Sequence, residues 1–307
     1  MKPLTVIGNV NADLIMGPAA PWPKPGTEII LDHDELRVGG SAGNAALAWM
    51  GMGVEFSIAA NTGNDVFGTW LAEAFGSHGA AMPVHPGSTT LSVGIVHPDG
   101  ERTFFTTRGH LVHFSLADVL AALKGRDLSG GYGLLCGSFL TDRLVADYDR
   151  LFDWADGQGL SLALDTGWPS DGWTGANREA VRGWLGRCRI ALFNEVESTT
   201  LTDTADAVAA AHAMRALMPE GSVAVVKCGP GGAVAVDAAG QLHRAAAPEV
   251  TVVDTIGAGD VFNAGFLAAL AAGRPVGESL EAGVRTASRA ISTHPRSYEG
   301  SIPGAGA

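Results

Sequence analysis

The chain has 307 residues, of which 46% are hydrophobic and 42 are glycine, and its formal net charge is −12. This length can bury a large core, as one domain with an elaboration or as two. The acidic balance argues against a nucleic-acid partner, because binding to phosphodiester backbones requires a basic face. No run approaches 18 uninterrupted apolar residues and the N-terminus lacks a signal-peptide pattern, so we expect no membrane partner and a cytoplasmic protein.

Short β-rich runs alternate with alanine-rich helical runs through most of the chain. The expected strands are Leu4–Ile7, Glu55–Ala59, Tyr132–Cys136, Ser161–Asp165, Ile190–Phe193 and Val223–Lys227. The expected helices are Ser41–Met50, Phe67–His78, Arg143–Gly157, Arg178–Arg187, Thr204–Leu217 and Val261–Ala272. This alternation predicts an α/β fold with a parallel sheet covered by helices on both faces. Ligands of such sheets bind beyond the carboxyl ends of the strands.

Two regions, 14–38 and 90–107, depart from the alternation. The first holds several prolines and then the alternating run Glu28–Val38. The second holds two β-rich runs around the turn Pro98-Asp99-Gly100, which is a hairpin signal. We interpret both as strands of a small accessory sheet that forms either a lid over a site or a dimer contact.

Residues 254 to 260 read Asp-Thr-Ile-Gly-Ala-Gly-Asp and directly precede an expected helix. Gly257 and Gly259 let the backbone approach an anion, and the free N–H groups of the first helical turn point at it. Asp260 would repel a phosphate if that were its only task. A carboxylate at this position is explained if it takes a proton from a hydroxyl that attacks the phosphate. The alternative for Asp260 is an ordinary N-terminal helix cap.

Other polar or glycine-rich clusters lie near expected strand ends. The loop 39–44, Gly-Gly-Ser-Ala-Gly-Asn, opens a helix but lacks the Gly-Lys-Ser/Thr end of a Walker loop. Asn11 and Asp13 suit either substrate hydroxyls or the capping of a turn. Asn-Glu-Val-Glu at 194–197 suits hydrated magnesium or a helix cap. Lys-Cys-Gly-Pro-Gly-Gly at 227–232 suits the phosphates of a nucleotide or a plain hairpin.

Together these positions closely resemble the PfkB, or ribokinase-like, carbohydrate kinases. The resemblance covers the whole chain in order and rests on residues 11–13, 39–44, 60–68, 194–197, 227–232, 254–260 and 301–303. It implies a single ribokinase-like domain over 1–307, with a central mostly parallel sheet flanked by helices. It also implies a small β-lid, formed here by segments 14–38 and 90–107, through which we expect a homodimer.

The resemblance further implies transfer of the ATP γ-phosphate to a hydroxymethyl group of a sugar, sugar acid or nucleoside, with Mg²⁺ accompanying ATP. Asp260 would be the base, and the amides of Gly257, Ala258 and Gly259 would form an anion hole. Substrate contacts are implied for Asn11, Asp13, Gly40 and Asn44; ATP contacts for Asn194, Lys227, Gly229, Gly232 and Thr286; and a water-mediated magnesium contact for Glu197. Many relatives also bind a monovalent cation such as K⁺ beside the anion hole, and Asp254 and Ser301 match two of its ligand positions.

Three departures from ribokinases proper bear on the substrate and the cation. Ser41 replaces a lysine, and Phe139 aligns with a glutamate that contacts ribose. Pro295 and Arg296 replace small residues of the cation loop. We therefore expect ribose to be a poor substrate and a nucleoside or a sugar acid to be better, with Arg108 and the nearby Arg102 on the lid hairpin as candidates to meet a carboxylate. A non-catalytic sugar or nucleotide sensor on the same fold is the alternative function, although a sensor has no need of a base.

Overall fold

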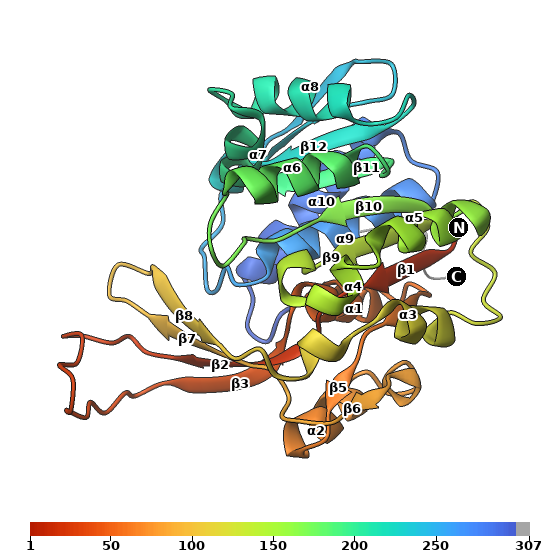
Figure 1. Ribbon diagram of the computed structural model, residues 1–307. Helices are drawn as coiled ribbons and strands as arrows, with labels where there is room; N and C mark the ends of the chain where they lie inside the picture. The colour runs from red at the N-terminus through yellow and green to blue at the C-terminus, as the bar shows by residue number, and fades with distance from the viewer. Residues whose placement is uncertain (299–307) are drawn as a thin grey trace.

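The computed structural model describes residues 1–298 and is built around an eight-stranded sheet (Figure 1). Its strands lie in the order β14 (Leu242–Ala245), β13 (Ala233–Val236), β12 (Val223–Lys227), β11 (Ile190–Asn194), β10 (Ser161–Asp165), β9 (Tyr132–Cys136), β1 (Leu4–Ile7) and β4 (Ser57–Ala59). Neighbouring strands from β12 through β4 pair in parallel, whereas β13 and β14 add an antiparallel edge. The sheet is therefore mostly parallel, as the alternation predicted.

Helices cover both faces of this sheet, and each face has its own apolar core. One core packs under α1 (Ser41–Gly51), α2 (Val66–Ala74), α9 (Ala258–Ala271) and α10 (Val276–Ile291). The other packs under α3 (Leu116–Ala122), α4 (Asp142–Val145), α5 (Tyr148–Gly157), α6 (Gly175–Leu185), α7 (Glu195–Thr202) and α8 (Ala207–Leu217). In β9, Leu134 and Cys136 join the first core and Leu135 joins the second. Burial on both faces explains why the strands are continuous apolar runs.

A second sheet projects from the body and is called here the lid sheet (Figure 1). It has the order β3 (Asp34–Gly39), β2 (Asn11–Met16), β7 (Leu91–Val96) and β8 (Arg102–Thr106). The accessory sheet expected from segments 14–38 and 90–107 is thus present. Its first strand begins already at Asn11, and residues 28–33 of the expected alternating run are not a strand. A short two-stranded sheet, β5 (Thr62–Gly63) with β6 (Val84–His85), lies near α2.

Several expected boundaries shift in the structure. The helix expected over 143–157 is divided into α4 and α5 by a break at Ala146 and Asp147. The last helix before the described end, α10, is amphipathic and buries residues such as Leu280 and Val284 against α9. Within residues 1–298, every helix is too short or too polar to cross a lipid bilayer.

Candidate active site

The turn that precedes α9 needs glycine at one position in particular. Gly257 has a left-handed φ of 73°, and a Cβ there would lie 2.7 Å from the side-chain amide of Asn44. Gly259 already belongs to the first turn of α9, where a Cβ would meet only the end of the flexible Lys227 side chain, at 3.3 Å. Strict dependence on glycine therefore falls on Gly257 rather than on Gly259.

The start of α9 offers backbone donors to an anion. The amide of Ala258 donates to the carbonyl of Thr255 at 3.1 Å, so this one of the three expected anion-hole amides is already engaged. The amides of Gly257 and Gly259 meet no acceptor among residues 1–298. Because unpaired N–H groups at a helix N-terminus attract negative charge, these two amides are available to bind an anion.

Asp260 lies in the same first turn of α9, and its carboxylate is hydrogen-bonded to Asn44, a residue from the N-terminal part of the chain. The Nδ2 of Asn44 donates to its Oδ2 at 2.9 Å. Burial and the nearby charge of Asp165 raise the pKa of Asp260 to about 6, against hydrogen bonds from Asn44 and Ser41 and the positive charge of Lys227. A carboxylate with this pKa is ionised at neutral pH and still accepts a proton readily, as a general base must.

Asn11 and Asp13 lie on β2, at the base of the lid sheet. The Nδ2 of Asn11 donates to Oδ1 of Asp13 at 2.6 Å, and a Cβ at Gly39 would lie 2.1 Å from the Asp13 carboxyl carbon. A Cβ at Gly40 would similarly come within 2.4 Å of the Asn9 carbonyl oxygen. The two glycines therefore let the loop before α1 close over these polar groups.

Asp13 also shares an electrostatic environment with the candidate base. Burial raises the pKa of Asp13 to about 6, opposed by the charges of Arg37 and Arg296 and the hydrogen bond from Asn11, while the charge of Asp260 raises it further. The structure thus brings Asn11, Asp13, Gly40, Asn44 and Asp260 to one place, although they come from opposite ends of the sequence.

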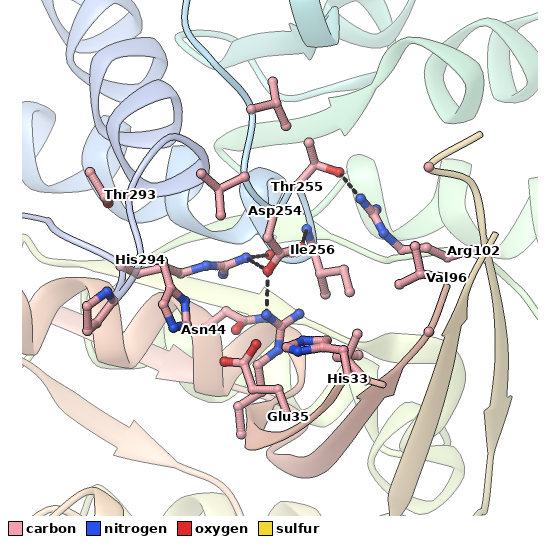
Figure 2. A pocket seen from close by; sticks show the side chains of 18 of the residues that line it. His33, Glu35, Asn44, Val96, Arg102, Asp254, Thr255, Ile256, Thr293 and His294 are labelled. Atoms are coloured by element: carbon pink, nitrogen blue, oxygen red, sulfur yellow. Dashed lines mark hydrogen bonds and ion pairs between the residues drawn. The ribbon is translucent and has the colours of Figure 1, made fainter. Parts of the chain in front are cut away.

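Two cavities meet at the turn before α9. The first, of about 800 Å³, lies under the lid sheet and is lined by His33, Glu35, Arg37, Asn44, Arg102, residues 252–256 and residues of the 293–298 segment (Figure 2). The second, of about 580 Å³, is lined by Lys227, Gly229, Gly232, Ala258, Gly259, Phe262 and residues of α10. Val252 and Thr255 line both cavities. This arrangement allows two ligands to approach each other across the turn.

A buried polar network lies beneath the turn, and the sequence analysis missed two of its members. The ammonium of Lys227 lies 2.6 Å from Oδ2 of Asp165 and 3.3 Å from Oδ1 of Asn263, and Asn263 Nδ2 donates to Asp165 at 2.5 Å. Burial alone would lower the pKa of Lys227, but the charges of Asp165 and Glu197 hold it above its usual value. Two sequence signals could have predicted these residues. Asp165 lies at the carboxyl end of a buried strand, and Asn263 follows Asp260 by one helical turn, so it lies on the same side of the helix.

Asn194 and Glu197 form a reciprocal cap on α7. The Asn194 side chain accepts from the Glu197 amide at 2.8 Å, and the Glu197 carboxylate accepts from the Asn194 amide at 3.0 Å. Asn194 also lines a cavity of about 400 Å³ together with Lys227 and Gly229. Glu197 is buried, and burial and the charge of Asp165 raise its pKa to about 7. Glu197 lines neither this cavity nor the second one, and its carboxylate already accepts a hydrogen bond, so its position does not suit a direct metal ligand.

Thr286 does not line the second cavity, contrary to the expectation of an adenine contact. Its side chain is fully buried, and its hydroxyl donates to the carbonyl of Ala282 at 2.8 Å. The same hydroxyl packs so closely on α9 that a Cβ at Gly265 would lie 2.4 Å from it. Ala287 and Ser288, the next residues of α10, line the cavity instead.

Arg108 and Phe139 lie away from the first cavity, whereas Arg102 lines it. Arg108 pairs with Asp142 at 2.6 Å on the surface, with 75% of its side chain exposed, and it does not line the cavity. Arg102 does line it and donates to the Thr255 hydroxyl at 2.6 Å (Figure 2). Phe139 packs against Trp173 and Trp184 at the second core, so it forms no aromatic wall for a ligand.

The expected monovalent-cation ligand Asp254 is already paired with two arginines. Its Oδ2 accepts from Nη1 of Arg37 and, at 2.6 Å, from Nη2 of Arg296, which also donates to the Ile256 carbonyl (Figure 2). Although burial alone would raise the pKa of Asp254, the Ile256 amide and these arginines hold it below its usual value. One carboxylate in contact with two guanidinium groups does not fit a further cation. Ser301, the other expected ligand, lies outside the described residues.

Comparison with known proteins identifies the family of this chain. Residues 1–298 match the family described as pfkB family carbohydrate kinase. The chain is 28% identical over 295 residues to an uncharacterized sugar kinase of Escherichia coli K12, YegV, which covers 92% of this chain and 86% of that protein. It is also 39% identical over 82 residues to fructoselysine 6-kinase of E. coli K12, over 26% of this chain and 31% of the kinase, so this match spans about a third of that relative's length.

Solved structures show the same fold. A ribokinase of Arabidopsis thaliana complexed with ribose and ATP superposes with a TM-score of 0.75 at 23% identity, covering 99% of this chain and 96% of that one. A ribokinase of Thermotoga maritima gives a TM-score of 0.75 at 21% identity with the same coverage. These TM-scores show the ribokinase-like fold. Because the family model matches residues 1–298, the chain belongs to the pfkB family of carbohydrate kinases.

Proposed function

We propose that this kinase transfers the γ-phosphate of ATP to a hydroxymethyl group of a sugar acid, with Asp260 as the base. The observation that carries the proposal is the position of the 254–260 turn, which has one cavity on each side and unpaired amides at its helix end. Asp260 lies in the same helical turn as these amides and is hydrogen-bonded to Asn44, which lines the first cavity. A carboxylate close to both an acceptor cavity and a phosphate-binding helix N-terminus is what phosphoryl transfer to a hydroxyl requires.

In this mechanism the acceptor hydroxyl lies against Asp260 and gives its proton to the carboxylate as it attacks. The hydrogen bond from Asn44 to Oδ2 of Asp260 keeps the carboxylate oriented toward the acceptor hydroxyl. The amides of Gly257 and Gly259 then receive the charge that develops on the transferred group. The ammonium of Lys227 lies next to Gly259 and adds positive charge on the phosphate side. Magnesium bound with ATP would neutralise the phosphates. Asn194, which lines the third cavity beside Lys227, would contact it, and Glu197 would act only through water.

The second cavity supports binding of the nucleotide. Phe262, Val284 and Ala287 give it an apolar wall suited to a flat base. Lys227 and the glycines 229 and 232 lie at its other side, where the backbone can approach phosphates closely. Since α9 begins between the two cavities, a nucleotide in this cavity would direct its terminal phosphate to the amides at the helix start.

The proposed acceptor class rests on Arg37. This residue is the cross-strand partner of Asp13, so the two side chains lie on the same face of the lid sheet. One guanidinium nitrogen of Arg37, Nη2, is buried and has no hydrogen-bond partner among residues 1–298. Leaving a charged donor unpaired is costly, and a carboxylate on the substrate would satisfy it. The packing of Phe139 removes the reason to prefer a nucleoside.

An ADP-release assay over sugar acids, neutral sugars of the same carbon skeleton and nucleosides tests this function. We expect a sugar acid to give a kcat/KM at least about tenfold above its neutral counterpart, as one charge-assisted hydrogen bond provides. The Arg37→Met variant should reduce this ratio, whatever it does to absolute rates. A ligand that raises Tm without any release of ADP would instead identify a sensor.

Two accompanying proposals concern assembly and location. The outer face of the lid sheet carries an apolar row across all four strands, formed by Leu36, Leu14, Val93 and Phe105, which are register partners in turn. Leu36 and Phe105 are 44% and 55% exposed. The apolar row would be buried between two copies of the chain, which supports a homodimer through the lid sheet.

Dependence on ATP supports a location in the cytoplasm.

A further inference from the structure

Arg296 occupies a position that is bordered by oxygen atoms. One of its guanidinium nitrogens, Nη2, lies 2.6 Å from Oδ2 of Asp254 and also contacts the carbonyl oxygen of Ile256. A carboxylate and a backbone carbonyl are the ligands that a hard cation prefers. Here a side chain of the protein itself places positive charge between them. Only 16% of the Arg296 side chain is exposed.

Through these contacts Arg296 helps to fix the backbone of the turn at residues 254–257. The Asp254 carboxylate accepts from the Ile256 amide at 2.9 Å, and Arg296 donates to the carbonyl of the same Ile256. The amides of Val253 and Asp254 donate to the carbonyl of Ile291, the last residue of α10. The end of α10 and the segment that follows it therefore hold the turn at several points, directly before the left-handed Gly257 and the first amides of α9.

The charge balance leaves no room for a second cation. Asp254 contributes one negative charge, whereas Arg37 and Arg296 contribute two positive charges in contact with it. The wider lining of the cavity holds Glu35, Asp99 and Glu101, but none of these makes an ion pair with either arginine among residues 1–298. The charge of Arg296 also reaches the substrate side, where it lowers the pKa of Asp13.

We propose that Arg296 is a built-in cation that replaces a bound monovalent metal ion in this enzyme. Its guanidinium holds the 254–256 turn and supplies permanent positive charge beside the anion hole, so phosphoryl transfer does not depend on K⁺. Arg296 is a positioning residue, because it acts through Asp254 and Ile256 and not on the reacting atoms. The inference rests on the proposed role of the turn in phosphoryl transfer.

The test compares activity in chloride salts of choline, Li⁺, Na⁺, K⁺ and Rb⁺. With ionic strength held constant, wild-type kcat/KM should differ by less than about twofold among these salts. Arg296→Ala should lose at least about tenfold in choline, because the anion-hole amides lose their support. K⁺ or Rb⁺ should restore part of the loss, and Arg296→Lys should retain most of the activity in every salt.

Arg289→Gln is the matched control. Arg289 lies in the last turn of α10, just before the segment that carries Arg296, and donates to the Ser297 hydroxyl. It does not contact Asp254, so its removal should leave both rate and salt response unchanged. Activation of the wild type several-fold by K⁺ over choline would overturn the proposal. So would an Arg296→Ala enzyme that is fully active in choline, or one whose loss neither K⁺, Rb⁺ nor the lysine variant restores.

A readout without turnover separates this inference from the identity of the acceptor. The increase in Tm that ATP with magnesium produces should be the same in choline and K⁺ for the wild type, and larger in K⁺ than in choline for Arg296→Ala. If Arg296→Ala does not fold, Arg296→Gln retains hydrogen-bonding capacity without charge and takes its place. A wild-type response to ATP that requires K⁺ would overturn the proposal even if no acceptor had been found.

Discussion

The side-chain amide of Asn44 donates a 2.9 Å hydrogen bond to the carboxylate of Asp260, and the same amide closes over Gly257. Asn44 lies in the first turn of α1 and Asp260 in the first turn of α9, so the N-terminal ends of two helices meet at this bond. The candidate base and the candidate anion hole thus both contact one residue that is distant in the sequence. The first two predictions follow from this contact.

Asp260→Asn should lower kcat by about 10² or more while leaving the affinity for the acceptor within a few-fold, because the amide keeps the shape but cannot take the proton. Single-turnover kinetics together with equilibrium binding of the acceptor would measure both effects. Asn44→Ala is the companion variant, and it should lose less activity because the carboxylate remains. A rate for Asp260→Asn close to that of the wild type would assign proton removal to another group.

Gly257→Ala should be much more harmful than Gly259→Ala. The former places a Cβ in the left-handed region and 2.7 Å from the Asn44 amide, whereas the latter meets only the flexible end of Lys227. We expect Gly257→Ala to lower kcat/KM by at least about tenfold, consistent with roughly 1–3 kcal/mol of local strain. Steady-state kinetics of the two variants, checked by circular dichroism, makes the comparison. Equal losses in both would show that the special backbone conformation is not required.

The pH dependence should have an acidic limb near the pKa of Asp260. Since burial raises that pKa to about 6, kcat/KM should fall about tenfold per unit once the pH drops below about 6. Asp13, whose pKa is also raised to about 6, makes the fall steeper if its ionised form binds the acceptor. A pH–rate profile at subsaturating acceptor reports this limb. A profile that stays flat to about pH 4.5 would exclude a base with a raised pKa.

The same shift predicts an effect on stability. The folded-state pKa of Asp260 lies above its unfolded value. The stability that the protonated Asp260 gives to the folded state is therefore fully present at low pH and is lost as the pH rises through about 6. Asp260→Asn should therefore have a higher Tm than the wild type at pH 8 and little advantage at pH 4. Asp237→Asn is the opposite case, because hydrogen bonds from His243 and backbone amides outweigh burial and lower the pKa of Asp237, and it should lower Tm at pH 8. Differential scanning calorimetry at the two pH values would reveal the signs.

Association should depend on the apolar row of the lid sheet. Leu36→Asp combined with Phe105→Asp should convert the expected dimer to a monomer without unfolding the body, because both side chains are already exposed in the single chain. Light scattering at micromolar protein measures the change. The same double substitution at the exposed Leu120 and Leu217, which lie on α3 and α8 and not on the lid sheet, serves as the control. A monomeric wild type would contradict the proposed dimer.

Elements buried on both faces could be predicted from the sequence at the level of single residues. β1, β9, β10 and β12 begin and end where expected, because a continuous apolar run bounded by polar or glycine residues allows few other readings. The backbone motifs were also accessible, since a glycine turn before a helix carries its own local geometry. The early glycine loop and the later turn could be paired only through the family resemblance.

Side-chain directions and long-range contacts could not be predicted in this way. Thr286 lies on α10, which lines the second cavity, but its position on that helix turns it toward α9. Phe139 follows a central strand, yet it packs against tryptophans that come later in the chain. Asp165 and Asn263 meet only because β10 ends beside the start of α9. Each of these facts depends on the tertiary packing of elements and not on local pattern.

The burial of α9 divides the molecule into a fixed part and a part that is able to move. Nearly every residue from Val261 to Ala271 is buried, so this helix cannot shift without disrupting the first core. The lid sheet is the part that is able to move. It is held to the turn before α9 by contacts between single side chains, Arg37 with Asp254 and Arg102 with Thr255. Amide hydrogens of α9 should accordingly exchange only on global unfolding, and those of β3 and β8 through local opening. Entry of substrate and exit of product would then require the lid arginines to release the turn, while the base keeps its place throughout the cycle.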